Sequence, residues 1–252
     1  MRARNTTMMT KTMLRLCCAL AVLAPLTLSS AAMAQDSPEA RIEAYRERVE
    51  RLEDKLAIEN LQSYFGYYFD KGMWTDVADL FTNDGRFEYG QRGVYVGKDR
   101  IQRALLLFGP EGLAQGYLNT HMQLQSVVIV APDGRTATGR WQGMMQLAEP
   151  GASGVWGIGI YENEYVKEGG VWKISSLHFY PTAMTDYDLG WARSTLPMEG
   201  QSALFPPDEP PTEIYRSMPG AYIPPFSYDH PVTGVPLRDV IVQAPDDILG
   251  RE

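Results

Sequence analysis

Cysteine is almost absent from this chain. Only two of its 252 residues are cysteines, Cys17 and Cys18, and both lie before Gln35. The rest of the chain therefore has no thiol that can form a disulfide or ligate a metal. It also lacks a Gly-rich phosphate loop, a His-x-x-x-His pair and a Gly-x-Ser-x-Gly elbow. We therefore predict chemistry that needs no metal and no cofactor.

Positive charge is also scarce once the segment 1–34 is set aside. That segment holds four basic side chains and no acidic one, so 19 basic and 31 acidic residues remain after it. A surface this acidic repels phosphate backbones, and we predict that nucleic acid is not a partner. The chain that follows Ala34 is long enough to bury a sizeable core.

The segment 1–34 is typical of a secretory signal peptide. A basic start is followed by an apolar run from Leu16 to about Leu28 and by the small-residue pattern Ala32-Met33-Ala34. The apolar run is shorter than the roughly 20 residues that a membrane span needs. We predict export to the periplasm, with cleavage after Ala34 and no stable membrane association afterwards. The alternative is an uncleaved N-terminal anchor.

Apolar periodicity predicts helices first and strands later in the chain. The predicted helices cover residues 38–72, 74–81 and 98–108, with a turn signal at 83–85. The predicted strands form a short hairpin and then a long meander, over residues 86–89, 94–97, 118–130, 136–147, 154–167 and 171–180. This order predicts an α+β domain in which a curved antiparallel sheet wraps around three helices.

Residues 181–252 have a different composition, because they hold 12 of the 17 prolines of the chain together with scattered aromatic residues. Composition alone permits disorder. The aromatic residues favour instead an irregular but ordered C-terminal arm that covers the barrel mouth or a neighbouring subunit. The predicted organisation is a signal peptide (1–34), a folded domain (35–182) and a Pro/aromatic-rich extension (183–252). We expect a homodimer or homotrimer.

Several motifs in order carry a resemblance to a known family. They are Lys55–Leu61, Phe69-Asp70-Lys71, Trp74–Phe81, Tyr95–Asp99, Thr120-His121-Met122, Tyr161–Tyr165 and Gly170–Ile174. Together, over about residues 45–182, they resemble the SnoaL-like branch of the NTF2-like superfamily. That branch includes scytalone dehydratase, hexachlorocyclohexane dehydrochlorinase and lignin diarylpropane lyases. The resemblance implies a cone-shaped barrel of the cystatin-like kind.

The same resemblance implies a catalytic pair. In the enzymes of this branch an Asp at the end of the first helix orients a His on the sheet, and the matching positions here are Asp70 and His121. Strand alternation independently places His121 on one face with Gln123 and Gln125. A His with polar companions inside a barrel can act as a general base near neutral pH. The alternative is a hydrogen-bonded structural His.

Further site residues are predicted with less support from the residues themselves. Tyr68 and Tyr89 are candidate catalytic tyrosines, and the candidate substrate-binding residues are Tyr64, Trp141, Asn163 and His178. Aromatic residues on a helix more often belong to the core than to a site. The chain also departs from scytalone dehydratase, because Phe69 precedes the matching Asp and residues 141–147 contain no second His. Phe65 replaces the basic helix residue of the dehydrochlorinase.

The function that the resemblance implies is a cofactor-independent acid–base lyase, of the dehydratase or deformylase type, acting on a hydrophobic aromatic compound. One branch deformylates lignin-derived diarylpropane diols with release of formaldehyde, and an exported, aromatic-rich chain is compatible with that reaction. The alternative is a non-catalytic small-ligand-binding module. The two hypotheses differ in geometry: catalysis requires Asp70 and His121 within hydrogen-bond distance and facing a closed cavity.

Overall fold

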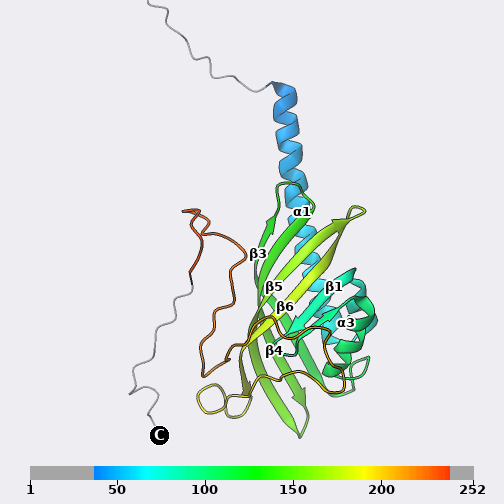
Figure 1. Ribbon diagram of the computed structural model, residues 1–252, viewed down its shortest axis with the longest axis vertical. Coiled ribbons are helices and arrows are strands. Elements are labelled where there is room, and N and C mark those ends of the chain that lie inside the picture. Colours follow the sequence, from blue (N-terminus) through cyan, green and yellow to red (C-terminus); the bar gives the residue numbers. More distant parts are fainter. Residues whose placement is uncertain (1–36, 239–252) are drawn as a thin grey trace, which may run out of the picture. The chain divides into compact units, whose positions relative to one another are not determined.

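The computed structural model describes residues 37–238, so the predicted signal peptide and its cleavage site lie outside the described residues. The helices are α1 (Pro38–Asp70), α2 (Trp74–Asp79), α3 (Lys98–Leu105) and the short 3-10 helix η1 (Leu106–Phe108). The strands are β1 (Phe81–Tyr89), β2 (Val94–Val96), β3 (Leu118–Val130), β4 (Thr136–Glu149), β5 (Ser153–Glu168) and β6 (Val171–Asp186) (Figure 1). The predicted α+β class and its element order are confirmed.

All six strands belong to one curved sheet in the order β2-β1-β6-β5-β4-β3. The meander from β3 to β6 and the β1–β2 hairpin are antiparallel, as expected. The prediction of a wholly antiparallel sheet is wrong at one place, because β1 pairs with β6 in parallel. Periodicity within a strand says nothing about which distant strand will lie beside it, so the sequence pattern could not reveal this pair.

Several boundaries differ from the predicted ones, for example at α2, β1 and β6. Helix α2 ends at Asp79, because β1 already begins at Phe81. The predicted turn at residues 83–85 lies inside β1, where the pairing with β6 shifts register between Phe81 and Arg86. A glycine-containing segment can form a bulge within a strand as readily as it forms a turn. Strand β6 extends beyond its predicted end at Tyr180, to Asp186.

The C-terminal half of α1 packs against the concave face of the sheet (Figure 1). Its buried side chains include Ile58, Phe65 and Phe69, which join the aromatic core of the barrel. Gly66 permits a close approach to β3: a Cβ at this position would lie 3.3 Å from the backbone oxygen of His121. The absence of a side chain at Gly66 therefore brings the last turn of α1 close to the middle of β3.

The interior of the sheet is filled by rings. Gly143 on β4 and Gly159 on β5 are register partners, and Phe179 lies over both. A Cβ on Gly159 would lie 2.4 Å from the Phe179 ring, so a side chain there is incompatible with this packing. Phe179 in turn contacts Tyr161 with 4.3 Å between ring centroids. Rings therefore fill this part of the barrel.

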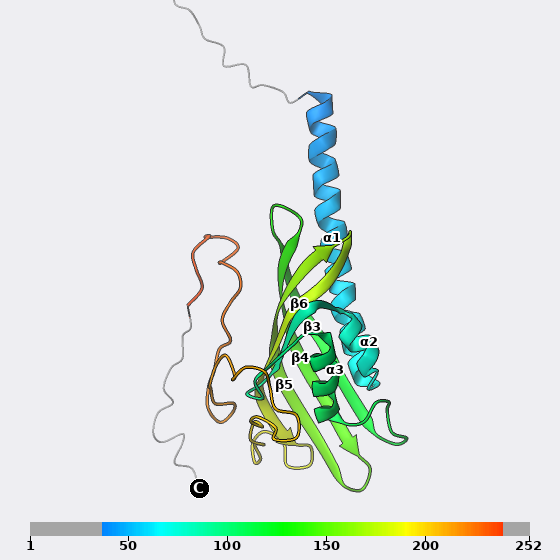
Figure 2. The ribbon, with the colours of Figure 1, turned by 45° about the vertical axis from the view of Figure 1, so that its right-hand side comes forward.

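The arm after β6 covers parts of the outer face of the sheet and reaches the barrel mouth (Figure 2). Glu209 forms an isolated bridge with Val94 of β2, and Thr212 donates two hydrogen bonds to Glu88 of β1. Further along, the Arg140 guanidinium on β4 donates to the backbone oxygen of Pro225. The irregular arm is therefore attached through side chains of the sheet and through single backbone hydrogen bonds rather than through a strand of its own.

None of the helices between residues 37 and 238 is long and apolar enough to cross a membrane.

Candidate active site

A cavity of about 790 Å³ opens beside the C-terminal end of α1. Its wall is built from the end of α1, the β1–β2 turn, the loop after η1, the first residues of β3, and residues 196–199 of the arm. Apolar side chains such as Trp74, Phe108 and Met184 form much of the lining. An apolar hollow with a few polar groups is the usual form of a small-molecule site.

His121 lines this cavity, and Asp70, which is not among the lining residues, contacts His121. Asp70 is the last residue of α1, and its Oδ1 atom accepts the backbone N–H of His121 at 2.6 Å. The same oxygen lies 3.3 Å from Nδ1 of the His121 ring. A negative charge at a helix C-terminus is electrostatically unfavourable, and these two contacts offset that cost. The side chains of both residues are largely buried, at 4% and 13% exposure.

This contact determines which ring nitrogen of His121 is available for chemistry. With Asp70 as the acceptor, Nδ1 carries the ring proton in the neutral imidazole and the lone pair is on Nε2. The ring of Phe69 stands edge-on to the imidazole at 4.6 Å and restricts its rotation. Because His121 lines the cavity and turns Nδ1 toward Asp70, Nε2 is the nitrogen that a ligand in the cavity can meet.

Tyr89 also lines the cavity. Its ring packs against Phe108 and Phe179, each at 4.8 Å, and its hydroxyl contacts Sδ of Met145 at 2.9 Å. Burial raises the pKa of Tyr89 well above its ordinary value of 10. The hydroxyl is therefore protonated at neutral pH, and in the structure it donates to Met145, which is not among the cavity-lining residues.

The other two tyrosines predicted for the site lie elsewhere. Tyr64 and Tyr68 stack on each other along α1, with ring centroids 6.0 Å apart, and neither lines the cavity. The Tyr64 side chain is half exposed, and Tyr68 packs against the core. Both residues are close to Asp70 in the sequence, but they lie on a different side of the helix from the cavity.

Trp141 and Asn163 lie inside the barrel, outside the cavity lining. Trp141 is buried edge-on against the Tyr165 ring at 5.8 Å. Asn163 donates to Oε1 of Gln62 at 2.9 Å, and Gln62 donates to Oε1 of Gln123 at 2.8 Å.

This polar chain ends at His121, because Gln123 donates to the backbone oxygen of His121 at 3.0 Å. Asn163 therefore belongs to a buried hydrogen-bond network that ties α1 and β5 to the strand of the catalytic candidate. The predicted alternation with Gln125 does not hold, because Gln125 has a positive φ of 51° at a bulge between Leu124 and Val127.

His178 lies on the opposite face of the sheet from the cavity. Its Nδ1 is 3.4 Å from Oε2 of Glu88, and its ring stacks on Tyr180 with 3.6 Å between centroids. Strand alternation accounts for this position, because the neighbouring Leu177 and Phe179 point into the core. The structure therefore does not place His178 among the cavity residues.

The parts of the cavity wall that sequence reasoning missed include Arg92, Asn119 and residues 196–199. Asn119 precedes His121 by two positions on β3 and donates to the backbone oxygen of Phe69 at 3.3 Å. Alternation from His121 could have identified it. Arg92 lies in a turn, and the arm segment follows only after the last strand of the sheet. No periodic pattern connects residues so far apart.

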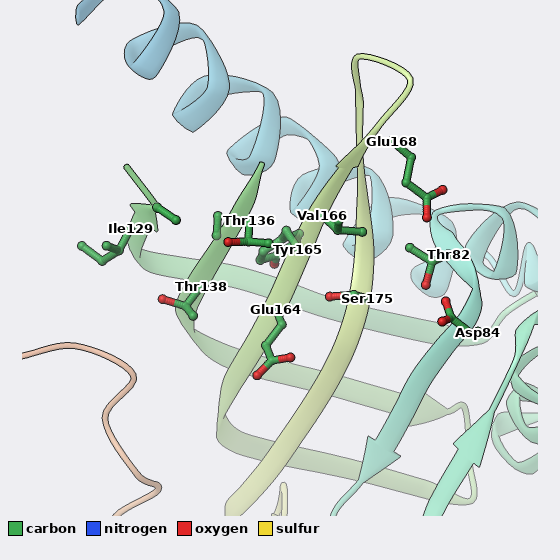
Figure 3. A pocket seen from close by; sticks show the side chains of 12 residues that line it. Thr82, Asp84, Ile129, Thr136, Thr138, Glu164, Tyr165, Val166, Glu168 and Ser175 are labelled. Carbon is green, nitrogen blue, oxygen red and sulfur yellow. The ribbon is translucent and has the colours of Figure 1, made fainter. Parts of the chain in front are cut away.

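A second hollow, of about 600 Å³, lies near the other end of the sheet (Figure 3). Hydroxyl and carboxylate side chains contribute to its lining, including Thr82, Asp84, Thr138, Glu164 and Ser175. No histidine is among its described lining residues, so no base–carboxylate pair of this kind faces it. Within residues 37–238, no group of three or more His, Cys, Asp or Glu side chains is arranged to hold a metal ion. The cavity at His121 is therefore the better candidate for acid–base chemistry.

Comparison with known families identifies the domain. A profile of the SnoaL-like domain family matches residues 50–178. The chain belongs to this family. The matched segment contains both Asp70 and His121 and stops before the arm. No curated protein matches the sequence.

Several solved structures resemble this one. A protein from Novosphingobium aromaticivorans named as a candidate scytalone dehydratase is 20% identical, covering 62% of this chain and 99% of its own, with a TM-score of 0.49. An NTF2-like protein with a cystatin-like fold from the same organism is also 20% identical, covering 58% and 91%, with a TM-score of 0.45. A hexachlorocyclohexane dehydrochlorinase is 22% identical, covering 55% and 92%, with a TM-score of 0.47. At these identities the resemblance says nothing about the reaction of this chain.

Proposed function

We propose that this SnoaL-like protein is a cofactor-independent acid–base lyase that acts on a hydrophobic aromatic compound. The observation that carries the proposal is His121, paired with Asp70, at the wall of a largely apolar cavity of about 790 Å³. A general base needs a free lone pair, an orienting partner and space for the substrate. His121 has all three, and Tyr89, whose hydroxyl is protonated, also lines the cavity.

In the proposed reaction, Nε2 of His121 removes a proton from a C–H or O–H group of the substrate. The electron pair of that bond forms a new double bond as a neighbouring bond to the leaving group breaks. The leaving oxygen takes a proton from an acid of the cavity wall, for which we propose Tyr89. Asp70 stabilises the imidazolium form of His121. The proton that His121 has taken up then returns through water to Tyr89. General acid–base help of this kind supplies roughly 10²–10⁴-fold in rate.

A finer proposal concerns the substrate. For a diarylpropane diol, His121 takes the proton of the primary hydroxyl and the adjacent C–C bond breaks, releasing formaldehyde. The electron pair of that C–C bond forms the stilbene double bond and expels the benzylic hydroxyl, which leaves as water with the proton from the acid. Aromatic side chains at the cavity wall, including Trp74 and Phe108, support an aromatic substrate.

The proposed location is the periplasm. N-terminal sequencing of the protein from fractionated cells tests this location.

The test uses the purified protein with a panel of aromatic diols and hydroxylated aromatics, followed by absorbance and by mass of the products. We expect turnover that His121→Ala lowers by roughly 10²–10⁴-fold. The matched control is His178→Ala, which removes the other buried histidine that lies beside a carboxylate. We expect that control to retain the rate, with the fold of both variants checked by circular dichroism.

Two results would contradict the proposal. Equal turnover in the unmodified chain and His121→Ala would move the chemistry away from this pair. Binding of the panel compounds without any turnover would favour the non-catalytic ligand-binding module, which uses the same cavity but no proton transfer.

A further inference from the structure

Arg92 is a cation in the cavity wall that the proposed chemistry does not use. It lies in the turn between β1 and β2 and is, among the lining residues, the single Lys or Arg. Its side chain is 14% exposed, and its Nη2 atom pairs with the carboxylate of Glu199 on the arm. Glu199 also lines the cavity, but its side chain is 70% exposed. The pair therefore joins a buried cation to a carboxylate that stands largely in solvent.

A guanidinium carries five N–H donors in one plane. In the part of the chain that the structure describes, Glu199 is the only hydrogen-bond partner of the Arg92 guanidinium. The Phe108 ring lies 5.6 Å from its central carbon, and burial lowers the pKa of Arg92. A buried cation needs an anionic partner, whereas a solvent-exposed carboxylate is held only weakly. Another anion that enters the cavity can therefore replace Glu199.

We propose that Arg92 is an anion subsite of the cavity, which binds a carboxylate or an ionised phenol of the substrate, and that Glu199 occupies this subsite when no ligand is bound. The planar guanidinium matches two oxygens of a carboxylate. Binding there displaces Glu199 and frees residues 196–199 of the arm to readjust around the ligand. The position of the reacting group near His121 rests on the proposed function; the anion subsite itself does not.

The test compares probes with charged and neutral head groups. Binding of 3-phenylpropanoate and of neutral 3-phenylpropanol is measured by isothermal titration calorimetry, with 4-nitrophenol above its pKa as a phenolate probe. We expect the carboxylate to bind roughly tenfold or more tightly than the alcohol, because a charge-assisted hydrogen bond is about twice as strong as a neutral one. Arg92→Met removes that preference, and Glu199→Gln tightens carboxylate binding severalfold.

Comparing the binding of 4-nitrophenolate with that of 3-phenylpropanoate shows which anion the subsite accepts. Equal carboxylate-to-alcohol ratios in the unmodified chain and Arg92→Met overturn the subsite. So does a preference that disappears equally in the control Arg86→Met, which removes an arginine that pairs with Glu209 of the arm outside the cavity. His121→Ala separates the two proposals, since we expect it to lower turnover but to keep the charge preference. Absence of turnover with an intact preference contradicts the lyase and leaves the subsite standing.

A different observation supports a second inference, about the outward side of α1. Five apolar side chains there are each between 52% and 67% exposed. They follow one another at steps of three, four, three and four: Ile42, Tyr45, Val49, Leu52 and Leu56. Asp54 and Ile58, which face the barrel, are buried on the other side of the helix. The N-terminal half of α1, from Ile42 on, extends beyond the strands (Figure 2).

Alternating steps of three and four are the a and d positions of a coiled coil, whose apolar seam needs a partner helix. We propose that this stripe pairs with the same stripe of a second copy in a parallel two-stranded coiled coil. Arg48 and Glu53 then occupy flanking g and e positions, so that Arg48 of each copy faces Glu53 of the partner subunit. Arg46, the other e residue, is already paired with Glu43 and Glu50 of its own helix.

Two heptads are few for an isolated coiled coil, but the C-terminal half of α1 is already held helical by the barrel. The unfavourable step of helix nucleation is therefore not part of dimer formation. We expect a dimer at micromolar concentrations, measured by light scattering during size-exclusion chromatography. Leu52→Glu makes the chain monomeric, whereas the control Glu47→Gln, on the opposite side of the helix, leaves the dimer intact.

Orientation is tested with Leu56→Cys in a chain whose Cys17 and Cys18 are replaced by serine. In the parallel register the two introduced thiols meet, and oxidation gives a disulfide-linked dimer. A dimer that does not cross-link at this position overturns the parallel arrangement. A chain that is monomeric at tens of micromolar, or dimeric despite Leu52→Glu, overturns the coiled coil altogether. Monomers that bind anionic vesicles through this stripe overturn it in favour of a lipid surface.

Discussion

Two histidine–carboxylate pairs lie on opposite faces of one sheet. On the concave side, Nδ1 of His121 is 3.3 Å from Asp70; on the outer side, Nδ1 of His178 is 3.4 Å from Glu88. All four side chains are largely buried. Distance and burial alone therefore do not distinguish a catalytic pair from a structural one.

The difference lies in what surrounds each pair. His121 borders open space, whereas His178 is stacked on Tyr180, and the arm residue Thr212 donates both its backbone N–H and its hydroxyl to Glu88. The Nε2 atom of His178 is buried with no hydrogen-bond partner in the described chain. Burial also lowers the pKa of His178 to about 3. The outer pair is thus neutral at the histidine and anchors the arm, and access to a cavity is what makes the inner pair a candidate for catalysis.

The largest effect on this comparison is expected from removing one carboxylate charge. Asp70→Asn keeps an oxygen for the backbone N–H of His121 but loses the charge that stabilises the imidazolium, so the rate should fall roughly 10²-fold. The equivalent change on the outer face, Glu88→Gln, should leave the rate unchanged. Steady-state kinetics with the best substrate of the panel measures both. Equal losses in the two variants would mean that the outer pair also contributes to catalysis.

A second prediction concerns stability, to which the outer pair is expected to contribute by holding the arm. Glu88→Ala leaves the Thr212 donors without their acceptor, so the free energy of unfolding should fall by about 1–3 kcal/mol. The control is Glu209→Gln, which removes an exposed carboxylate that pairs with Arg86 of the same strand. Its effect should stay within about 1 kcal/mol. Urea unfolding measures both, and a Glu88→Ala protein as stable as the control would show that the outer pair does not hold the arm.

The pH dependence of the free energy of unfolding should show the contribution of His178. Its pKa is about 3 in the folded chain and 6.5 when unperturbed, so between these values the unfolded chain takes up a proton that the folded chain does not. Its contribution is therefore fully present above pH 6.5 and is lost as pH falls, with a limiting slope of about 1.4 kcal/mol per pH unit. His178→Phe should remove this slope. Urea unfolding at several pH values between 4 and 7 (roughly the window in which only the unfolded chain is protonated) compares the two proteins.

The smallest effect is expected for Tyr89. Tyr89→Phe keeps the ring contacts with Phe108 and Phe179 but removes the hydroxyl donor. The rate should fall about tenfold or less, because water can replace the donor. The Michaelis constant should change little, since the shape of the cavity is retained. A rate equal to that of the unmodified chain would assign proton donation to another group.

Much of the fold was predictable from local patterns. The apolar repeats and turn residues identified the helices and the four-strand meander, and β3 has the predicted limits. The family motifs led to Asp70 and His121, which meet as expected. The parallel β1–β6 pair and the bulge at residues 83–85 were missed, because both depend on which strand lies alongside β1.

By itself, the sequence determined the order of helices and strands, the SnoaL-like family and the residue types of the inner pair. Periodicity and short motifs encode these features locally, so they survive without knowledge of the packing. Only the tertiary structure decided that Tyr89 lines the cavity and Tyr64 does not, that His178 lies on the outer face, and that Arg92 meets Glu199. These contacts join segments that lie far apart in the sequence, and their partners are chosen by the packing of rings and glycines in the barrel rather than by any local pattern.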